Sequence, residues 1–293
     1  MPGGYRWVRL GQWDMAVSSY ARATWRLIRS APADGPTNMA VDEAILRAVV
    51  AGLVPPTLRF YAWEPACLSL GRAQSVEDVD LEVLRAAGFD LVRRPTGGKA
   101  ILHVDELTYS VVAPQEEPHV AGGIVESYRR LSSGLVRGLE RLGVADLVAD
   151  QRIENRGLEG PVCFEVPSDY EITVDGRKLV GSAQMRARGV VLQHGALPLY
   201  GDITRICPLL AAHPEPARVR ARATTVEEAL GSLGSVRAGR TVTWDEAAEA
   251  MAAGFSEALN LHFEVGTLTD EERAWAQELR ATKYATDGWA SRV

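Results

Sequence analysis

Apolar residues in the N-terminal part of the chain form a strand-like run followed by a stretch with helical spacing. TWRLI, from Thr24, predicts a strand, and GPTNMAVDEAILRAVVAG predicts the helix that follows it. We expect Thr37 or Asn38 near the cap of this helix and Gly52 to end it. The helical spacing is carried by Ala40, Ala44, Leu46 and Val50.

Short apolar runs continue as far as residue 114. LRFYAWEP and ACLSLGR predict two strands separated by Pro65, and residues 75–87 predict a helix closed by Gly88. FDLVRRP predicts a strand and ILHVDELTYSVVAP a longer one. GIVESYRRLSSGLVRGLERLG then predicts an amphipathic helix, because apolar side chains recur every three or four residues, at Ile124, Tyr128, Leu131, Leu135 and Leu139.

A meander and two helices are predicted in the second half of the chain. YEITV and RKLVGSAQMR flank Asp175-Gly176, a two-residue hairpin signal, and Arg188-Gly189 leads into VVLQHGALPLY. WDEAAEAMAAGFSEALN and DEERAWAQELRATKY predict helices. We therefore expect one α+β domain over residues 24–293, a mixed β-sheet flanked by helices, with a small helical C-terminal part from about residue 240. Residues 1–23 show no clean periodicity and are expected to form a loosely ordered extension.

Composition and charge narrow the functional class. The chain has 293 residues, 46% of them apolar, which is enough for a sizeable core. Its 38 acidic residues exceed its 32 basic ones, and the net charge of -6 argues against nucleic-acid binding. There is no run of about 18 apolar residues to span a membrane, and the N-terminus has no apolar signal core. We expect a cytoplasmic protein with no nucleic-acid or membrane partner.

The stretch RRPTGGKAILHVDELTYSVV places two arginines, a glycine pair and a lysine ahead of a strand. It is not a Walker loop, because Gly97-Gly98-Lys99 is followed by Ala100 and not by Ser or Thr. The glycine pair predicts either a flat turn where a ligand lies against bare backbone or an ordinary connecting turn. Successive strand side chains point to opposite faces, so at most one of Arg93 and Arg94 faces this turn.

Single polar residues in this region need separate interpretation. A lone histidine in a strand, such as His103, is more often a hydrogen-bonded core or rim residue than a catalyst. Only three of the 32 basic residues are lysines: Lys99, Lys178 and Lys283. A lysine kept in such an arginine-rich chain can serve a role that arginine cannot, such as losing a proton, although chance retention stays equally open.

The meander carries two glycines inside predicted strands. Gly181 lies next to Ser182, and Gly195 lies next to His194. Glycines in paired strands remove side chains and can open a slot. With Lys178 three residues ahead of the first glycine, such a slot would suit an apolar chain that carries a reactive carbonyl.

The three cysteines are too few and too scattered to predict a disulfide framework or a zinc site, and we expect no metal. Cys67 and Cys207 lie in apolar stretches, which favours packing. Cys163 lies in the polar loop GPVCFEVPSD. A loop thiol near a cationic lysine can act as a nucleophile.

The order and spacing of several stretches resemble the cysteine-dependent octanoyltransferases of the LipM type, within the biotin/lipoate protein ligase-like superfamily. The similarity covers nearly all of the chain from about Thr24. It is carried by NMAVDEAIL, RFYAWEPACLSLGRAQ, RRPTGGKAILHVDELTYSVV, VCFEVPSDYEITVDGRKLVGSAQMR, GVVLQHGALPL and TKYATDGW.

The resemblance implies a biotin/lipoate protein ligase-like fold, of the class II aminoacyl-tRNA synthetase/biotin synthetase type. It implies octanoyl transfer, without a cofactor, from octanoyl-acyl carrier protein to a lysine of a lipoyl domain. The acceptor would be the glycine cleavage H protein or the acyltransferase subunit of a 2-oxo-acid dehydrogenase. Cys163 would carry the octanoyl group as a thioester, and Lys178, the lysine of GRKLVGSAQ, would assist it. The residues expected to bind substrate are Arg93, Arg94, Thr96, Gly97, Gly98, His103, Gly181, Ser182, Ala183, His194 and Gly195.

Three other functions stay open. A lipoate–protein ligase would activate free lipoate with ATP and magnesium and would need no cysteine, so Cys163 in its VCFEVPSDYE context argues against it. An amidotransferase that moves octanoyl or lipoyl between lipoyl proteins would also use a cysteine. A non-catalytic module that binds acylated proteins would tolerate loss of Cys163.

Overall fold

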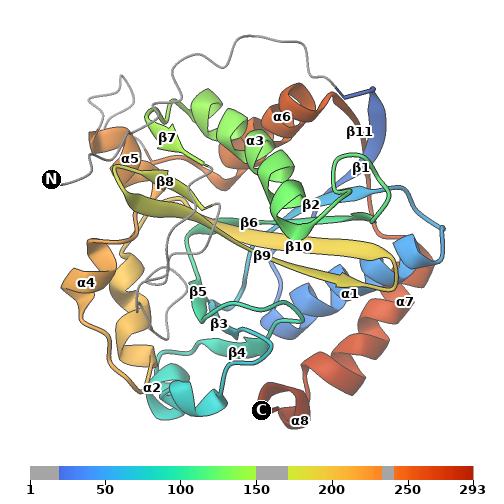
Figure 1. Ribbon diagram of the computed structural model, residues 1–293. Coiled ribbons are helices and arrows are strands. Elements are labelled where there is room, and N and C mark those ends of the chain that lie inside the picture. Colours follow the sequence, from blue (N-terminus) through green and yellow to red (C-terminus); the bar gives the residue numbers. More distant parts are fainter. Residues whose placement is uncertain (1–19, 150–170, 233–240, 293) are drawn as a thin grey trace, which may run out of the picture.

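The computed structural model describes residues 20–149, 171–232 and 241–292. Its largest element is an eight-stranded mixed sheet, shown in Figure 1. Along the sheet, the strand order is β11 (Leu261–Gly266), β1 (Ala23–Arg29), β2 (Thr57–Tyr61), β6 (Glu106–Pro114), β10 (Val190–Pro198), β9 (Arg177–Ala187), β8 (Ile172–Val174) and β7 (Leu147–Val148).

The sheet combines parallel and antiparallel pairs. β1 is parallel to both of its neighbours, β11 and β2. The pairs from β2 through β6, β10, β9 and β8 to β7 are antiparallel. A second sheet has three strands, in the order β4 (Asp90–Arg93), β3 (Cys67–Leu70) and β5 (Ile101–His103). The expected mixed sheet flanked by helices is confirmed.

Helices cover both faces of the main sheet (Figure 1). α3 (Ile124–Leu142) and α6 (Trp244–Leu259) share one apolar core with the sheet, and α1 (Gly35–Val50) and α7 (Asp270–Leu279) share another. The shorter helical segments are η1 (Val76–Asp78), α2 (Leu81–Ala86), η2 (Ile203–Leu209), α4 (Pro216–Arg220), α5 (Val226–Ser232), η3 (Arg280–Tyr284) and α8 (Asp287–Ala290).

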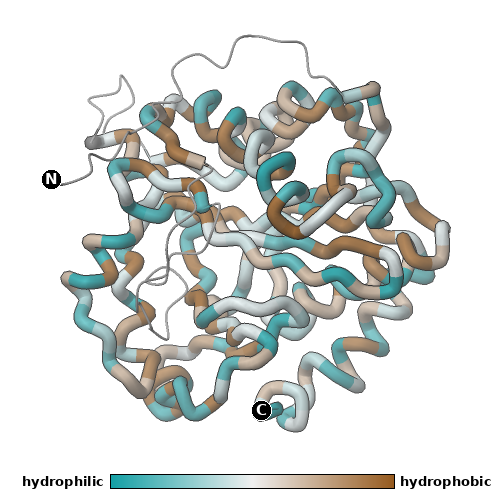
Figure 2. Tube along the Cα trace, in the orientation of Figure 1, coloured by the Kyte–Doolittle hydropathy of each residue, from teal (hydrophilic) through white to brown (hydrophobic). Residues whose placement is uncertain are grey.

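Strand β6 shows how the two cores arise from one sequence. Leu107, Tyr109 and Val111 belong to the core under α3 and α6, whereas Val112 belongs to the core under α1. This alternation follows from the two-residue period of a strand. Each fully buried side chain of this kind contributes roughly 1.5–3 kcal/mol to the stability of the fold. In Figure 2 the tubes of α3 and α7 alternate between hydrophilic and hydrophobic colours, as amphipathic helices should.

Both predicted two-residue turns are present. Asp175 and Gly176, between β8 and β9, have φ values of 49° and 74°. Arg188 and Gly189, between β9 and β10, have φ values of 52° and 75°. Two consecutive positive φ values define the hairpin turn whose twist matches that of the flanking strands. The meander that carries the two strand glycines is therefore confirmed.

The residue that caps α1 was not named from the sequence. Asp34 is the N-cap, and its carboxylate accepts a hydrogen bond of 2.7 Å from the Thr37 amide. Asn38 is fully buried inside the helix, and its side-chain amide donates to the carbonyl oxygens of Ala33 and Ala62. Thr37 and Asn38 therefore lie near the cap, as expected, but the cap itself is Asp34, and Pro36 lies in the first turn, where proline is tolerated.

Two predicted elements are interrupted. The helix expected at residues 75–87 is divided into η1 and α2, and Asp80 caps the second piece. The strand expected from Ile101 to Pro114 is divided into β5 and β6, which belong to different sheets. Asp105 lies at that break with a φ of 52°. Neither break carries the Gly or Pro that usually marks a turn in sequence.

The C-terminal part of the chain contains a strand as well as helices. β11 follows α6 and pairs in parallel with β1 at the edge of the main sheet. The expected extension at residues 1–23 lies outside the described residues up to residue 19, and β1 already begins at Ala23. None of the helices in the described ranges has the length and apolar character needed to cross a bilayer.

Candidate active site

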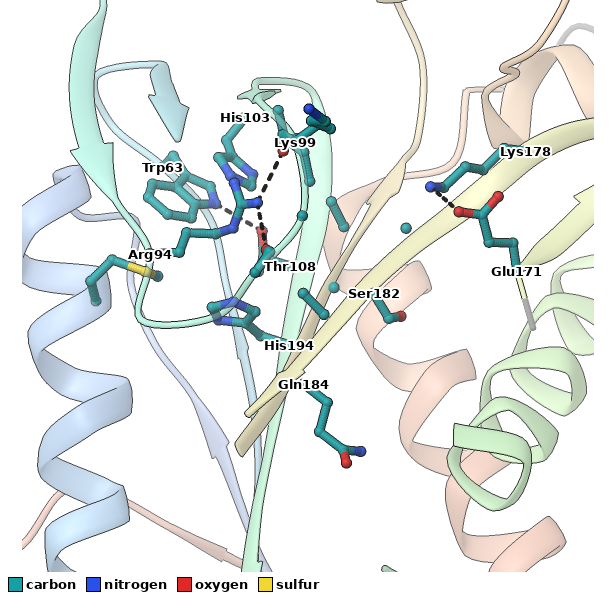
Figure 3. Close-up of a pocket in the computed structure, with 18 of the residues that line it drawn as sticks. Trp63, Arg94, Lys99, His103, Thr108, Glu171, Lys178, Ser182, Gln184 and His194 are labelled. Atoms are coloured by element: carbon teal, nitrogen blue, oxygen red, sulfur yellow. Dashed lines mark hydrogen bonds and ion pairs between the residues drawn. The ribbon is translucent and has the colours of Figure 1, made fainter. Parts of the chain in front are cut away.

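A cavity of about 280 Å³ lies between the glycine turn that follows β4 and the strands β9 and β10. Figure 3 shows its wall, with Lys178 on one side and the residues around His103 on the other. Lys178 and most of the residues expected to bind substrate line it. Those that do are Arg94, Gly97, Gly98, His103, Gly181, Ser182, Ala183, His194 and Gly195.

Arg93 is not among the residues that line this cavity. It is fully buried and donates hydrogen bonds to the carbonyl oxygens of Gly71 (2.9 Å), Trp289 (3.1 Å) and Ala290 (2.7 Å). The indole of Trp289 in turn donates to the Arg93 carbonyl at 2.9 Å. Arg93 therefore fastens α8 to β4, and the structure corrects the expectation that it lines the acyl pocket.

Arg94 supports the glycine turn from inside. Its guanidinium donates to the carbonyl oxygens of Gly97 (3.1 Å), Lys99 (3.0 Å) and Ser69 (2.9 Å). A Cβ atom on Gly97 would meet no atom of the described residues within 4 Å, so this residue faces open space. Gly98 has a φ of +95°, which favours glycine. The turn is thus a flat, firmly held backbone surface at the cavity.

His194 lines the cavity, and both of its ring nitrogens contact buried polar side chains. Its Nε2 lies 2.6 Å from the Thr96 hydroxyl, and its Nδ1 lies 3.3 Å from a carboxylate oxygen of Asp42. Burial lowers the pKa of His194, against the opposing effect of Asp42. Thr96 is fully buried and does not line the cavity, so the structure also corrects its expected contact with substrate.

Asp42 is the centre of a buried polar cluster. Its carboxylate accepts hydrogen bonds from Arg59 (2.8 Å), Tyr61 (3.0 Å) and Ser110 (2.8 Å). Burial by itself would raise the pKa of Asp42, but the hydrogen bond to His194 and the charge of Arg59 lower it. A buried carboxylate requires such compensation. The cluster therefore fixes the two cavity residues attached to it, His194 and Tyr61.

His103 forms part of the cavity wall without a free ring nitrogen. Its ring stacks on Trp63 with centroids 4.1 Å apart. Its Nδ1 lies 2.7 Å from Glu106, and its Nε2 lies 2.6 Å from the Ser69 hydroxyl. The Trp63 indole donates to the Thr108 hydroxyl at 2.8 Å. These contacts agree with the interpretation of His103 as a hydrogen-bonded rim residue.

The strand glycines let backbone approach backbone at the cavity floor. In the sheet, Gly195 is paired with Tyr109 on β6 and with Ser182 on β9. A Cβ atom on Gly195 would lie 2.6 Å from the Gly181 carbonyl oxygen and 2.6 Å from a ring carbon of Tyr109. No side chain fits there. Burial raises the pKa of Tyr109 to about 12, so its hydroxyl stays protonated and bonds to Ser182 and Gln193.

Lys178 is buried, with 4% of its surface exposed, and forms an ion pair with Glu171. Both side chains line the cavity. Cys163 lies outside the described residues, and Glu171 is the first described residue after the segment that contains it. The other two cysteines are buried. Burial raises the pKa of the Cys67 thiol well above its usual value, as expected for a packing residue.

Sequence reasoning missed several residues of the wall: Met39, Tyr61, Trp63, Thr108, Tyr128, Glu171 and Gln184. Some lie inside stretches that carry the family resemblance, but periodicity marks them as ordinary strand or helix positions. Across the described ranges, no group of three or more His, Cys, Asp or Glu side chains could hold a metal ion. A lysine and a carboxylate beside a mainly apolar slot can bind an acyl chain and stabilise charge at its carbonyl end.

Comparison with known proteins places this geometry in a family. Residues 34–256 match the family model described as the lipoyl protein ligase A/B catalytic domain. The chain belongs to that family. Octanoyltransferase LipM of Kyrpidia tusciae is 47% identical over 271 residues, covering 91% of this chain and 98% of the relative. Octanoyltransferase LipM of Bacillus subtilis is 39% identical over 274 residues, covering 92% and 98%.

Solved structures of the lipoyl protein ligase family have the same fold. A crystal structure of lipoate-protein ligase A bound with ATP has a TM-score of 0.75 and 27% identity, covering 92% of this chain and 99% of that one. A putative lipoate protein ligase from T. acidophilum with bound lipoic acid has the same TM-score and identity, with 92% and 100% coverage. The expected biotin/lipoate protein ligase-like fold is therefore confirmed.

Proposed function

We propose that this protein is an octanoyltransferase of lipoate biosynthesis, which moves an octanoyl group from octanoyl-acyl carrier protein to a lysine of a lipoyl domain. The observation that carries the proposal is its similarity to octanoyltransferases LipM, at 39–47% identity over nearly the whole length of both chains. The cavity supports it, because a glycine-floored slot with a buried lysine at one side suits an acyl thioester.

The first half of the reaction would be an exchange of thioesters at Cys163. The thiolate attacks the octanoyl carbonyl, a new C–S bond forms, and the C–S bond to the carrier breaks with its electron pair going to the carrier sulfur, which leaves as a thiolate and takes a proton from solvent. One thioester replaces another of similar energy, so no ATP is required. The Lys178 ammonium would favour the thiolate form of Cys163 and the negative charge on the carbonyl oxygen.

The second half would be aminolysis. The neutral amine of the lipoyl-domain lysine attacks the octanoyl carbonyl, a C–N bond forms, and Cys163 leaves as the thiolate. The excess proton of the amine passes to the sulfur or to solvent. The amide product is more stable than a thioester, which drives the sequence forward.

Fold and family alone do not distinguish transferase from ligase, because a relative of similar architecture is a lipoate-protein ligase bound with ATP. The deciding experiment offers three donors to one lipoyl-domain acceptor: octanoyl-acyl carrier protein alone, free octanoate with ATP and magnesium, and an octanoylated lipoyl protein. We expect modification of the acceptor from the carrier protein without ATP. Modification only with free acid and ATP would show a ligase, and modification only from the lipoyl protein would show an amidotransferase.

A further inference from the structure

Lys178 reaches the cavity at an irregular point in strand β9. Thr173 of β8 is paired with Lys178, but the preceding Ile172 is paired with Val180, so Leu179 is an extra residue on β9. Leu179 and Val180 are both buried in the main core. An extra residue of this kind redirects the side chains next to it, and such bulges concentrate near active sites.

The backbone of Lys178 is fixed on both sides. Its amide donates to the carbonyl oxygen of Arg222 at 2.7 Å, and its carbonyl oxygen accepts from the amide of Thr224 at 3.0 Å. Its side chain is a flexible four-carbon stem, which these two backbone bonds do not orient. The backbone therefore sets where the stem begins, and a further contact is needed to set where the ammonium lies.

Glu171 provides that contact. Its carboxylate forms the buried ion pair with the Lys178 ammonium, and the two side chains point toward each other at the cavity wall (Figure 3). Their exposed fractions are 8% for Glu171 and 4% for Lys178. Glu171 is the only carboxylate among the described residues that line the cavity. A buried ammonium without a counter-charge is strongly disfavoured, so the carboxylate keeps the charge at this place.

We propose that Glu171 is a positioning residue for the transfer reaction: it holds the Lys178 ammonium, charged, at the wall of the acyl cavity. This inference rests on the proposed function, since it assigns Glu171 a role that passes through Lys178 to Cys163 and the thioester. It differs from a merely structural ion pair, because a structural pair would affect stability without affecting the thiol or the transfer rate in a Lys178-dependent way.

The experiment measures two rates in purified full-length variants: octanoyl transfer from the carrier protein, and alkylation of Cys163 by iodoacetamide, mapped by peptide mass spectrometry. Glu171→Gln keeps the shape of the side chain and removes its charge. We expect both rates to fall about tenfold or more, which corresponds to about 1.4 kcal/mol of activation free energy. Glu171→Asp keeps the carboxylate on a shorter stem and should recover part of the loss.

A double-mutant comparison with Lys178 distinguishes a positioning role of Glu171 from a general loss of structure. In a Lys178→Ala background, Glu171→Gln should cause little further loss of alkylation rate, because residues that act through one another are non-additive. Glu43→Gln is the matched control: it removes the carboxylate that pairs with Lys283 at 2.6 Å, and neither residue of that pair lines the cavity. We expect wild-type rates for it. Circular dichroism confirms that each variant is folded at the assay temperature.

Wild-type or faster alkylation and transfer in Glu171→Gln would overturn the inference. So would an equal loss in the presence and absence of Lys178. Failure of the proposed function gives a different result, namely no octanoyl transfer from carrier protein by the wild-type enzyme. Alkylation needs no acyl donor, so it still decides the role of Glu171 in that case.

Discussion

At the scale of single residues, the cavity wall is held by buried polar groups that satisfy one another. Asp42 is a carboxylate and can only accept, so His194 must donate to it from Nδ1. With the pKa of His194 lowered by burial, the ring is neutral and its Nε2 accepts the Thr96 hydroxyl proton. The ring is therefore locked in one tautomer, and it holds Thr96 and the neighbouring glycine turn in place.

This arrangement predicts a loss of stability in mild acid. The ordinary pKa of histidine is about 6.5, and that of His194 is lower in the folded state. Between these two values the unfolded chain binds more protons, so the free energy of unfolding rises with pH. The contribution of His194 is complete above about pH 6.5 and is lost as the pH falls toward its folded pKa.

Urea unfolding measured at a series of pH values from about 7.5 to 5 tests this. We expect His194→Gln, which cannot titrate, to show a smaller decrease in unfolding free energy over that range than the wild type. Equal slopes in the two proteins would contradict the account. Asp42 acts in a separate, more acidic window, because its pKa is lowered from 3.8 and its contribution is lost below that value.

The position of a site residue could be predicted from the sequence where the geometry of a single strand determines which way its side chain faces. Alternation along β4 correctly implies that only one of Arg93 and Arg94 faces the glycine turn. It cannot say which one, because the partners of Arg93 are Trp289 and Ala290, near the other end of the chain. Contacts over such separations have no local signal in the sequence.

At the scale of elements, α3 and α6 cross with unusually close backbones. A Cβ atom on Gly254 of α6 would lie 2.3 Å from the amide nitrogen of Gly138 and 2.5 Å from the carbonyl oxygen of Gly134, both on α3. A Cβ atom on Gly134 would meet Phe255 at 2.8 Å. Three glycines therefore set the distance between the two helices that cover one face of the main sheet.

We expect Gly254→Ala to destabilise the protein by about 2 kcal/mol or more, since overpacking a rigid contact forces the backbones apart. Gly231→Ala in α5 is the control, because its Cβ atom would meet no described atom within 4 Å. That change should be neutral or stabilising by roughly 0.5–1 kcal/mol. Denaturant midpoints of the two variants provide the comparison. Similar denaturant midpoints for Gly254→Ala and Gly231→Ala would show that α3 and α6 can move apart at little cost in stability, which would contradict this account.

Long elements with a regular apolar period could be predicted from the sequence. Elements that are interrupted, or that lie at the edge of a sheet, could not. The period of α3 and the two hairpin turns identify their elements directly. β11 was missed because it is a short edge strand with only one buried residue in six, so it lacks the apolar run of a buried strand. The break between β5 and β6 was missed because Asp105 adopts a positive φ without a glycine or proline beside it.

At the scale of the whole molecule, the cavity forms where distant segments meet. α1 contributes Met39, the loop before β5 contributes the glycine turn, and β9 and β10 contribute the floor. The periodicity of apolar residues cannot predict that such distant segments meet. Here that expectation came from the family resemblance, through the order of its motifs. Trp63 and Thr108 were still missed, because the resemblance as interpreted placed no function on them.

The central claim is that Cys163 carries the octanoyl group, and mass spectrometry of the intact protein tests it most directly. The enzyme is mixed with octanoyl-acyl carrier protein in the absence of ATP and acceptor, and any adduct is mapped by peptide analysis. We predict a single octanoyl adduct on Cys163 that hydroxylamine removes, as it removes thioesters. The adduct should be absent in Cys163→Ser and retained in Cys67→Ala and Cys207→Ala, whose thiols are buried. An adduct on another residue, or transfer at the wild-type rate by Cys163→Ser, would contradict the account.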